Sequence, residues 1–291
     1  MSSADPPIIA GPNTDLAAPK SALWTSIYTL AVREVTRFLR QRSRLVGAIG
    51  QPLVFWILFG AGLAGSFAMP GADAENGLSF QEYFLPGIAV LIVLFTSIFS
   101  SISVIQDRNE GFMQGVLVAP VPRSSIVLGK VLGGTALALF QAMLFLLLAP
   151  LLQFVHLAPQ MEFNYPVLVI LKALFFLFWI SLGLTALGYL FAWKIDSVQG
   201  YHGVMSIVLL PMWLLSGAFF PGSGSTWMTW VMRANPLTYG VAGLRKTLVA
   251  DPQRLPEFPP EWLCYVVTIG FALVCLFVDV WMTRRDPVVA S

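Results

Sequence analysis

Apolar residues along this chain gather in six long runs separated by shorter polar connections. A helix needs about 20 predominantly apolar residues to cross the hydrocarbon core of a bilayer. Because backbone groups cannot stay unpaired in lipid, runs of this length form helices. We predict an all-α integral membrane protein with six transmembrane spans, at about 45–67, 84–105, 126–154, 166–193, 204–220 and 262–282. The fifth run is the least secure, because it is short and contains Pro211.

Residues 21–42 have an amphipathic pattern instead. Apolar residues recur at helical spacing, and three basic residues occupy the other side: Leu23, Ile27, Ala31, Val35 and Phe38 against Arg33, Arg37 and Arg40. This pattern predicts a helix in the membrane interface whose basic cluster meets anionic headgroups. It could serve only as an anchor for the first span or take part in the mechanism. Residues 1–20 are predicted to be a disordered cytosolic tail, and residues 286–291 a second cytosolic tail.

Most of the 17 Lys and Arg residues fall on one side of the predicted spans. They precede the first span, lie in the second and fourth connections, and follow the last span. Connections rich in Lys and Arg stay in the cytosol. Both termini are therefore predicted to be cytosolic.

The segment 227–250 is apolar enough to suggest another crossing, but it contains Arg233, Arg245 and Lys246. Each would cost about 2.5–3.5 kcal/mol near the middle of the membrane. We therefore predict one or two short re-entrant helices that dip part-way in from the outer face and break at Asn235-Pro236. Such breaks are tolerated where protein or water covers them.

The composition agrees with a membrane protein. The 291 residues are 57% hydrophobic and only 11% charged, with a mean hydropathy of +0.76, whereas soluble domains carry about 25% charged residues. Cys264 and Cys275 are separated by about 16 Å of helix rise, too far to form a disulfide with each other. No cleavable signal peptide is visible at the N-terminus.

No catalytic constellation is found. His156 and His202 are isolated, without Cys, Asp or Glu at ligand spacing, so no metal site is expected. Gly129-Lys130 looks like the end of a phosphate loop, but Ser124 stands where glycine is needed and Val131 where Ser or Thr is needed. We expect no cofactor on this chain.

Coupling to an ion gradient has little support in the spans. Asp279 is the one acid inside them, and we expect it to reach the headgroups or to pair locally. A proton-coupled carrier usually needs a buried chain of Asp, Glu or His. Sodium coupling through backbone carbonyls stays open.

Residues 109–130, NEGFMQGVLVAPVPRSSIVLGK, form a more polar segment between the apolar runs of the second and third spans. Gly111 and Gly115 flank Phe112 and Met113, and Pro120 and Pro122 end any helix. A short helix with an apolar side, projecting into the cytosol, has a shape that docks in a groove of another protein. An ordinary loop along the membrane is the alternative.

Two motifs in this chain resemble those of the type-2 ABC exporter permeases, which serve drug, nodulation-factor and polysaccharide export. The first is Glu110-Gly111, then LVAPVPR at 117–123 and LGK at 128–130; the second is NPLTYG at 235–240 followed by Leu244-Arg245. The likeness covers about residues 21–285, which would form one transmembrane domain. It implies a multi-pass permease of the bacterial inner membrane, a homodimer, that binds two copies of a cytosolic ABC ATPase. ATP and Mg would be bound by that ATPase, and no nucleic acid is expected.

The resemblance also assigns roles to residues. The ATPase-coupling element would comprise Glu110, Gly111, Phe112, Met113, Gln114, Leu117, Pro120, Pro122 and Arg123. On the interfacial helix, Arg33, Glu34 and Arg37 would lie close to the same partner. Gly129 and Lys130 would mark the inner start of the third span. The outer re-entrant gate would contain Asn235, Pro236, Tyr239 and Arg245. Family members often have an acid where this chain has Gln114, whereas Glu110 stays available for a salt bridge to the ATPase.

The substrate is expected to be hydrophobic or amphipathic, drug-like or lipid-like, and to leave the cytoplasm or the inner leaflet. A path lined by apolar and aromatic groups would suit it: Phe95, Phe99, Met205, Met212, Trp213 and Phe219. These side chains could equally face lipid or pack a dimer. Export of a lipid-linked polysaccharide and an autonomous ion-coupled carrier are the alternatives.

Overall fold

The computed structural model describes residues 20–63, 80–118, 121–151, 166–219, 226–249, 255 and 259–285. Every regular element within these ranges is a helix, which confirms the all-α class. In chain order they are α1 (Lys20–Arg40), α2 (Arg42–Leu63), α3 (Phe80–Asn109), α4 (Phe112–Val118), α5 (Arg123–Leu148), α7 (Val167–Lys194), α8 (Val198–Trp213), the π-helical turn η1 (Leu214–Ala218), α9 (Thr226–Ala234), α10 (Pro236–Leu248) and α11 (Glu261–Arg285). Both predicted tails, apart from Lys20, lie outside the described residues.

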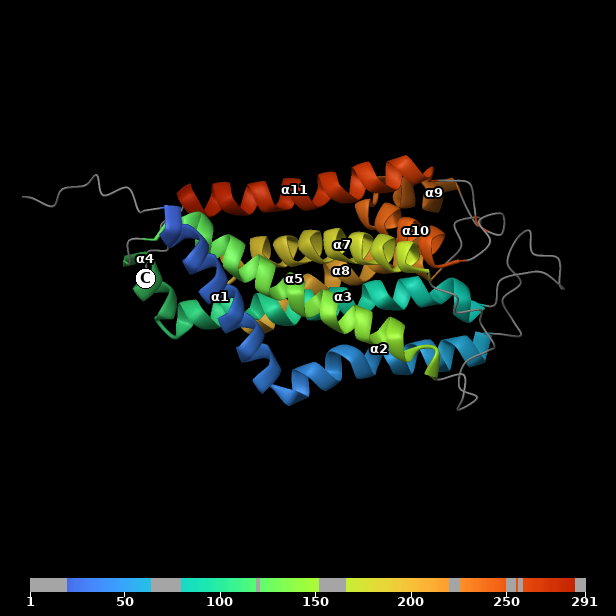
Figure 1. Ribbon diagram of the computed structural model, residues 1–291, viewed down its shortest axis with the longest axis horizontal. Coiled ribbons are helices and arrows are strands. Elements are labelled where there is room, and N and C mark those ends of the chain that lie inside the picture. The colour runs from blue at the N-terminus through green and yellow to red at the C-terminus, as the bar shows by residue number, and fades with distance from the viewer. Residues whose placement is uncertain are drawn as a thin grey trace, which may run out of the picture.

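The long helices lie side by side along one axis, and α1 crosses one end of this bundle obliquely (Figure 1). The short helix α4 lies at that same end, with the beginning of α1 and the end of α11 (Figure 1). Helices α9 and α10 lie at the opposite end. The predicted cytosolic segment and both described ends of the chain are therefore on one side, and the second family motif is on the other. Which side faces the cytosol stays a prediction.

Five described helices are long and apolar enough to cross a membrane: α3, α5, α7, α8 continued through η1, and α11. The first predicted span forms α2, but its apolar part is only Val46–Gly60. The last part of that prediction, 64–67, lies outside the described residues. The fifth run, predicted to be the weakest, gains length because α8 begins at Val198, where the Ser197 side chain accepts a hydrogen bond from the Gly200 backbone N–H. Among the described residues, the shortest apolar stretch of the six is therefore that of the first predicted span.

Helix α3 is the centre of the bundle and is buried along nearly its whole length. Polar side chains on it are paired across helix interfaces. Thr96 donates to Oε1 of Gln141 on α5 at 2.6 Å, and the hydroxyls of Ser97 and Thr185 on α7 are 3.1 Å apart. Hydrogen bonds of this kind help to hold membrane helices together. The middle of α3 is thus hydrogen-bonded to both α5 and α7.

Helix α1 packs directly on the backbone of α5. A Cβ atom added to Gly129 would lie 2.6 Å from Cβ of Leu30, and one added to Gly133 would lie 2.8 Å from Cβ of Glu34. Glycines four residues apart permit such close approach of two helices. Helix α1 is therefore part of the bundle and not a separate helix beside it.

We expect Gly133→Ala to lower the free energy of unfolding by about 1–3 kcal/mol, the usual cost of overpacking a tight contact. The new methyl group would also lie 3.0 Å from the backbone oxygen of Ala31. The measurement is thermal unfolding of the purified chain in detergent. Gly270→Ala is the control, because an added Cβ there meets nothing within 4 Å. Equal losses in the two variants would contradict the close packing of α1 on α5.

Candidate functional site

The segment around α4 is a short helix with a backbone break at each end. Gly111, which follows the end of α3, has a φ of 77°, a conformation that glycine adopts at little cost. At the other end Pro122 is extended, with φ −61° and ψ 132°, and stands at the N-cap of α5. The structure thus places a separate helix where the sequence predicts one. Pro120 lies outside the described residues.

Six charged side chains from α1, α3, the turn after α3, and α5 meet beside α4, and we call them the charge cluster: Arg33, Glu34, Arg37, Asp107, Glu110 and Lys130. Asp107 is its centre. The two terminal nitrogens of Arg33 donate to the two carboxylate oxygens of Asp107, each at 2.8 Å. Arg37 donates to the same carboxylate at 2.6 Å and Lys130 at 2.5 Å.

Three members of the cluster are buried, and its three acids balance its three bases. Asp107, Glu34 and Lys130 are only 0%, 3% and 4% exposed. Lys130 also donates to Glu34 at 2.7 Å and to Ser103 at 3.1 Å. The hydrogen bonds between Arg33 and Asp107 raise the pKa of Arg33 above its ordinary value. Since buried charges are costly unless each is paired, these groups stabilise the junction of α1, α3 and α5 only as a set.

One prediction about α1 is corrected by this geometry. Arg33 and Arg37 were expected to meet anionic headgroups, but both guanidinium groups turn inward to Asp107; Arg40 is exposed. Glu110 accepts from Arg37 at 3.3 Å and keeps 60% of its side chain exposed, so its salt bridge to the ATPase stays a prediction. The physical reason is the close approach of α1 to α5, which places these arginines over the end of α3.

Asp107 is the residue that the sequence analysis missed. The second span was predicted to end at 105, which left Asp107 in a connection, whereas α3 continues to Asn109 and carries it into the helix. Glu34 between two arginines, and Lys130 inside an apolar run, were the available signals. Buried basic groups require polar or charged partners, and Asp107 is an acid near the same end of the bundle.

Helix α4 has one face on the protein and one face free of it. The Phe112 ring lies 3.7 Å from the Arg33 guanidinium carbon, and Met113 is 1% exposed. Gln114 is exposed, and Val118 is 86% exposed. A groove of about 490 Å³ between α1 and α4 is lined by Leu30, Phe112 and Val116, among others. The side chain of Leu117 lies outside the described residues, and Arg123 reaches across to α11, where it donates to the Arg284 carbonyl at 3.1 Å.

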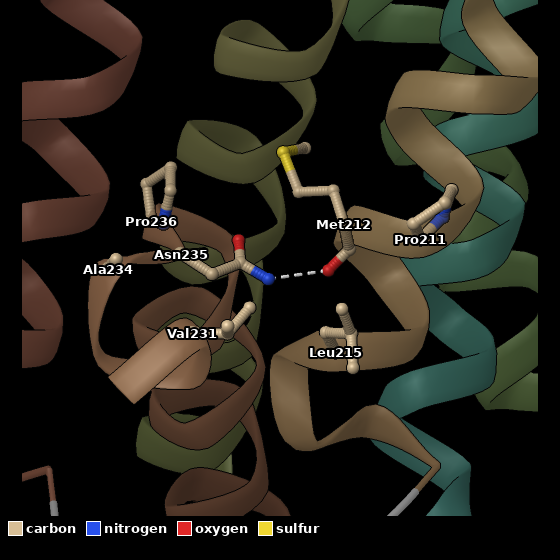
Figure 2. Close-up of a pocket in the computed structure, with 7 residues that line it drawn as sticks. All are labelled: Pro211, Met212, Leu215, Val231, Ala234, Asn235 and Pro236. Atoms are coloured by element: carbon tan, nitrogen blue, oxygen red, sulfur yellow. Dashed lines mark hydrogen bonds between the residues drawn. The ribbon is translucent and has the colours of Figure 1, made fainter. Parts of the chain in front are cut away.

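At the opposite end, Asn235 joins the α9–α10 pair to α8. Its side-chain oxygen accepts from the backbone N–H of Leu237 at 3.0 Å, which caps α10. Its side-chain nitrogen donates to the Met212 carbonyl at 2.6 Å (Figure 2). Asn235 and Pro236 line an apolar pocket of about 310 Å³ together with Pro211 and Met212. Tyr239 donates to the Arg233 carbonyl at 2.8 Å. Because α9 ends at Ala234 and α10 begins at Pro236, the helix break occurs where the sequence predicts it.

Arg245 is buried, with 6% exposure, although its charge was the reason for placing this segment outside the membrane core. The guanidinium donates to the carbonyls of Tyr83 at 3.2 Å and Gly217 at 2.8 Å and lies 3.7 Å from the centre of the Tyr83 ring. Gly217, inside η1, has a φ of 76°, and its carbonyl also accepts from the Tyr83 hydroxyl. Burial lowers the pKa of Arg245. Protein carbonyls and a ring replace the water that this cation loses.

The six residues of the predicted substrate path do not meet in one place. Phe95 and Phe99 stack with centroids 6.4 Å apart, and Phe99 meets His202 at 6.0 Å. Met205 is fully buried. The remaining three lie toward the α9–α10 end: Met212 on the pocket wall, Trp213 donating to the Gly87 carbonyl at 2.8 Å, and Phe219 packed 5.2 Å from Phe84. The path stays a prediction.

Asp279 corrects another prediction. It was expected to reach the headgroups or to pair locally, but it is fully buried on α11. Neither of its carboxyl oxygens has a hydrogen-bond partner within the described part of the chain. Helix packing, which the sequence does not reveal, places this side chain inside the bundle. In the same described part, no group of three or more His, Cys, Asp or Glu residues could hold a metal ion.

Comparison with known proteins identifies the family. Residues 25–249 match the family described as ABC-2 type transporter. The chain is 29% identical over 254 residues to a Cyanophora paradoxa protein named as a transport permease, ycf38. The aligned part covers 87% of this chain and 84% of that protein. It is 25% identical over 257 residues to the inner membrane transport permease YadH of Escherichia coli K12, covering 87% and 93%. It is 22% identical over 242 residues to the daunorubicin resistance ABC transporter permease protein DrrB1 of Streptomyces coeruleorubidus, covering 82% and 79%.

These matches explain why the chain has the helices of a transporter. Permeases of this family are membrane transport subunits, and ATP is hydrolysed by a partner ATPase. The sequence motifs that carried the resemblance lie at the two ends of the bundle, beside α4 and at the α9–α10 break. The chain belongs to the ABC-2 type transporter family and is a transport permease subunit of an ABC transporter.

Proposed function

We propose that this chain is the membrane-spanning subunit of an ATP-driven exporter of the bacterial inner membrane. Two copies form a homodimer and bind two copies of a cytosolic ATPase, which holds ATP and Mg. The observation that carries the proposal is α4, a short helix with a backbone break at each end that rests on the buried charge cluster. A helix of this kind transmits a push without deforming the long helices.

The docking surface for the ATPase is the free face of α4 with the neighbouring groove. Val118 and Gln114 are exposed. In the groove between α1 and α4, Phe112 and Val116 form an apolar wall, and α1 contributes Leu30 together with three hydroxyl-bearing residues. Apolar grooves with a helix at their edge are a common mode of recognition between proteins. Glu110, with most of its side chain exposed, supplies a charge at the rim.

Force applied to α4 passes to the spans through the charge cluster. Phe112 is in contact with Arg33, and Arg33 is bound to Asp107 at the end of α3. Lys130 ties the same acid to α5. Because well-packed and fully paired groups move together and do not deform gradually, a displacement of α4 shifts α1, α3 and α5 as one body.

The α9–α10 pair is the outer re-entrant gate in this proposal. Lys246 near the end of α10 donates to the Pro259 carbonyl, just before α11 begins. Toward its start, α10 packs with Gly240 against Ile180 and Thr268. Thr268 is about 10 Å along α11 from Glu261 by helix rise. The end of α10 therefore lies near the outer end of α11, and its start lies deeper. The Asn235-Pro236 break lies deeper still.

The substrate is hydrophobic or amphipathic and leaves the cytoplasm or the inner leaflet. Support comes from the apolar and aromatic walls at the α3–α8 contact and at the pocket beside Asn235. The name of the relative DrrB1 connects that protein with daunorubicin resistance. Export of a lipid-linked polysaccharide is the second candidate.

The test replaces Val118 by Asp, with Val118→Thr as a control of nearly the same shape. The permease is co-expressed and purified with its partner ABC ATPase. A carboxylate in an apolar interface is desolvated without a partner, so Val118→Asp should lose the ATPase during purification, whereas Val118→Thr retains it. If Val118→Asp binds the ATPase as well as the original chain, α4 is not the docking element. Transport by the permease alone, driven by an ion gradient in liposomes, would establish an autonomous carrier instead.

A further inference from the structure

Two arginines bracket the α4 segment, one on each side, and each reaches the carboxyl end of a different long helix. Arg108 is in the last turn of α3, and Arg123 is the first residue of α5. Arg108 donates to the carbonyls of Trp193 and Ile195 at the end of α7. Arg123 donates to the carbonyl of Arg284 at the end of α11, at 3.1 Å.

These contacts are matched to helix chemistry. The last four carbonyls of a helix have no partner within the helix, and the partial negative charge there attracts cations. Ile195, which caps α7, is extended and leads into α8 after two further residues. Arg108 also pairs with Asp196 at 3.0 Å, but the Asp196 side chain is 93% exposed. Since exposed ion pairs contribute little, the two carbonyls are the principal partners of Arg108.

We propose that Arg108 and Arg123 are positioning residues that carry a displacement of α4 to the inner ends of α7 and α11. This inference rests on the proposed coupling role of α4 and extends it to helices that α4 does not reach through the charge cluster. The breaks at Gly111 and Pro122 let α4 move as a unit. Its two attachment points, the end of α3 and the start of α5, carry these arginines. Movement of either point therefore pulls on a helix end of the α7–α11 pair.

The two arginines differ in what they require. Arg108 has a planar fork on two carbonyls, which a lysine does not reproduce. Arg123 donates to one carbonyl, that of Arg284, and a lysine ammonium can make the same contact. Arg123→Lys should therefore keep the link to α11, whereas Arg108→Lys should lose the link to α7.

The experiment uses the permease–ATPase complex in nanodiscs and measures backbone hydrogen–deuterium exchange with and without ATP and vanadate. Three segments are compared: 110–118 on α4, 193–198 at the end of α7, and 280–285 at the end of α11. In the original complex, nucleotide should change exchange in all three. In Arg108→Ala the change should persist in 110–118 and be lost in 193–198; in Arg123→Ala it should persist in 110–118 and be lost in 280–285.

Arg284→Ala is the control, because its exposed side chain is removed while the carbonyl that Arg123 binds remains. It should respond in all three segments. Nucleotide responses that persist everywhere in both alanine variants would overturn this inference and leave the proposed function intact. Absence of a response on α4 in the original complex would instead overturn the proposed function. If an alanine variant does not assemble, the lysine variants decide, and a full response of 193–198 in Arg108→Lys would refute the role of Arg108.

Discussion

Asp107→Asn should lower the free energy of unfolding by about 3–5 kcal/mol, the usual loss when one partner of a buried ion pair is removed. The carboxylate is fully buried and accepts from Arg33, Arg37 and Lys130. An amide of the same shape leaves three cations around a neutral group. The midpoint of thermal unfolding in detergent, measured for the purified chain, should fall accordingly. Stimulation of the partner ATPase by the permease should fall with it.

Two variants separate burial from mere loss of an acid. Glu110→Gln removes an acid of the same cluster that has 60% of its side chain exposed, so it should cost less than about 1 kcal/mol. In the double variant Asp107→Asn with Lys130→Met, one charge of each sign is removed. Its loss should be smaller than the sum of the two single losses, because the two groups interact directly. Additive losses would show that Lys130 and Asp107 do not form the pair described.

Arg245→Ala should destabilise the opposite end of the bundle by about 2–5 kcal/mol. The substitution leaves a cavity in place of a long buried side chain and removes charge-assisted hydrogen bonds to Tyr83 and Gly217. It also removes the stacking on the Tyr83 ring, 3.7 Å away. The measurement is again the midpoint of thermal unfolding. Proteolysis at η1 in the folded protein should become faster, since Gly217 then has one fewer side-chain donor.

Arg233→Ala is the matched control, an exposed arginine at the same end of the bundle. Substitutions of this kind usually change stability by no more than about 0.5 kcal/mol. Arg245→Lys tests the geometry, because an ammonium lacks the planar surface that stacks on the ring. If Arg245→Lys is as stable as the original protein, stacking on Tyr83 contributes nothing to this contact.

The helical class and the approximate position of each long helix could be predicted from the sequence alone. In lipid each backbone polar group must be hydrogen-bonded within the protein, and a helix does this within one segment. The length of an apolar run is therefore sufficient to predict a membrane helix. The short helix α4 and the break at Asn235-Pro236 could be predicted for a similar reason. Glycine and proline act on the backbone locally, within a turn or two of their own position.

The partners of the charged residues could not be predicted in this way. Asp107 meets basic groups on two other helices, and Arg33 is 74 residues away from it in sequence. Arg245 is buried because carbonyls of α3 and η1 surround it, and nothing in its own segment indicates them.

Local chemistry by itself therefore determined that this chain is a bundle of membrane helices with a separate short helix between the second and third predicted spans. Only the tertiary structure decided that α1 is packed on α5, that Asp107 is the common partner of three cations, and that Arg108 and Arg123 hold the ends of α7 and α11. The physical reason is range. Hydrophobicity and backbone preference act residue by residue, whereas a buried charge is stable only beside partners that folding brings from distant parts of the chain.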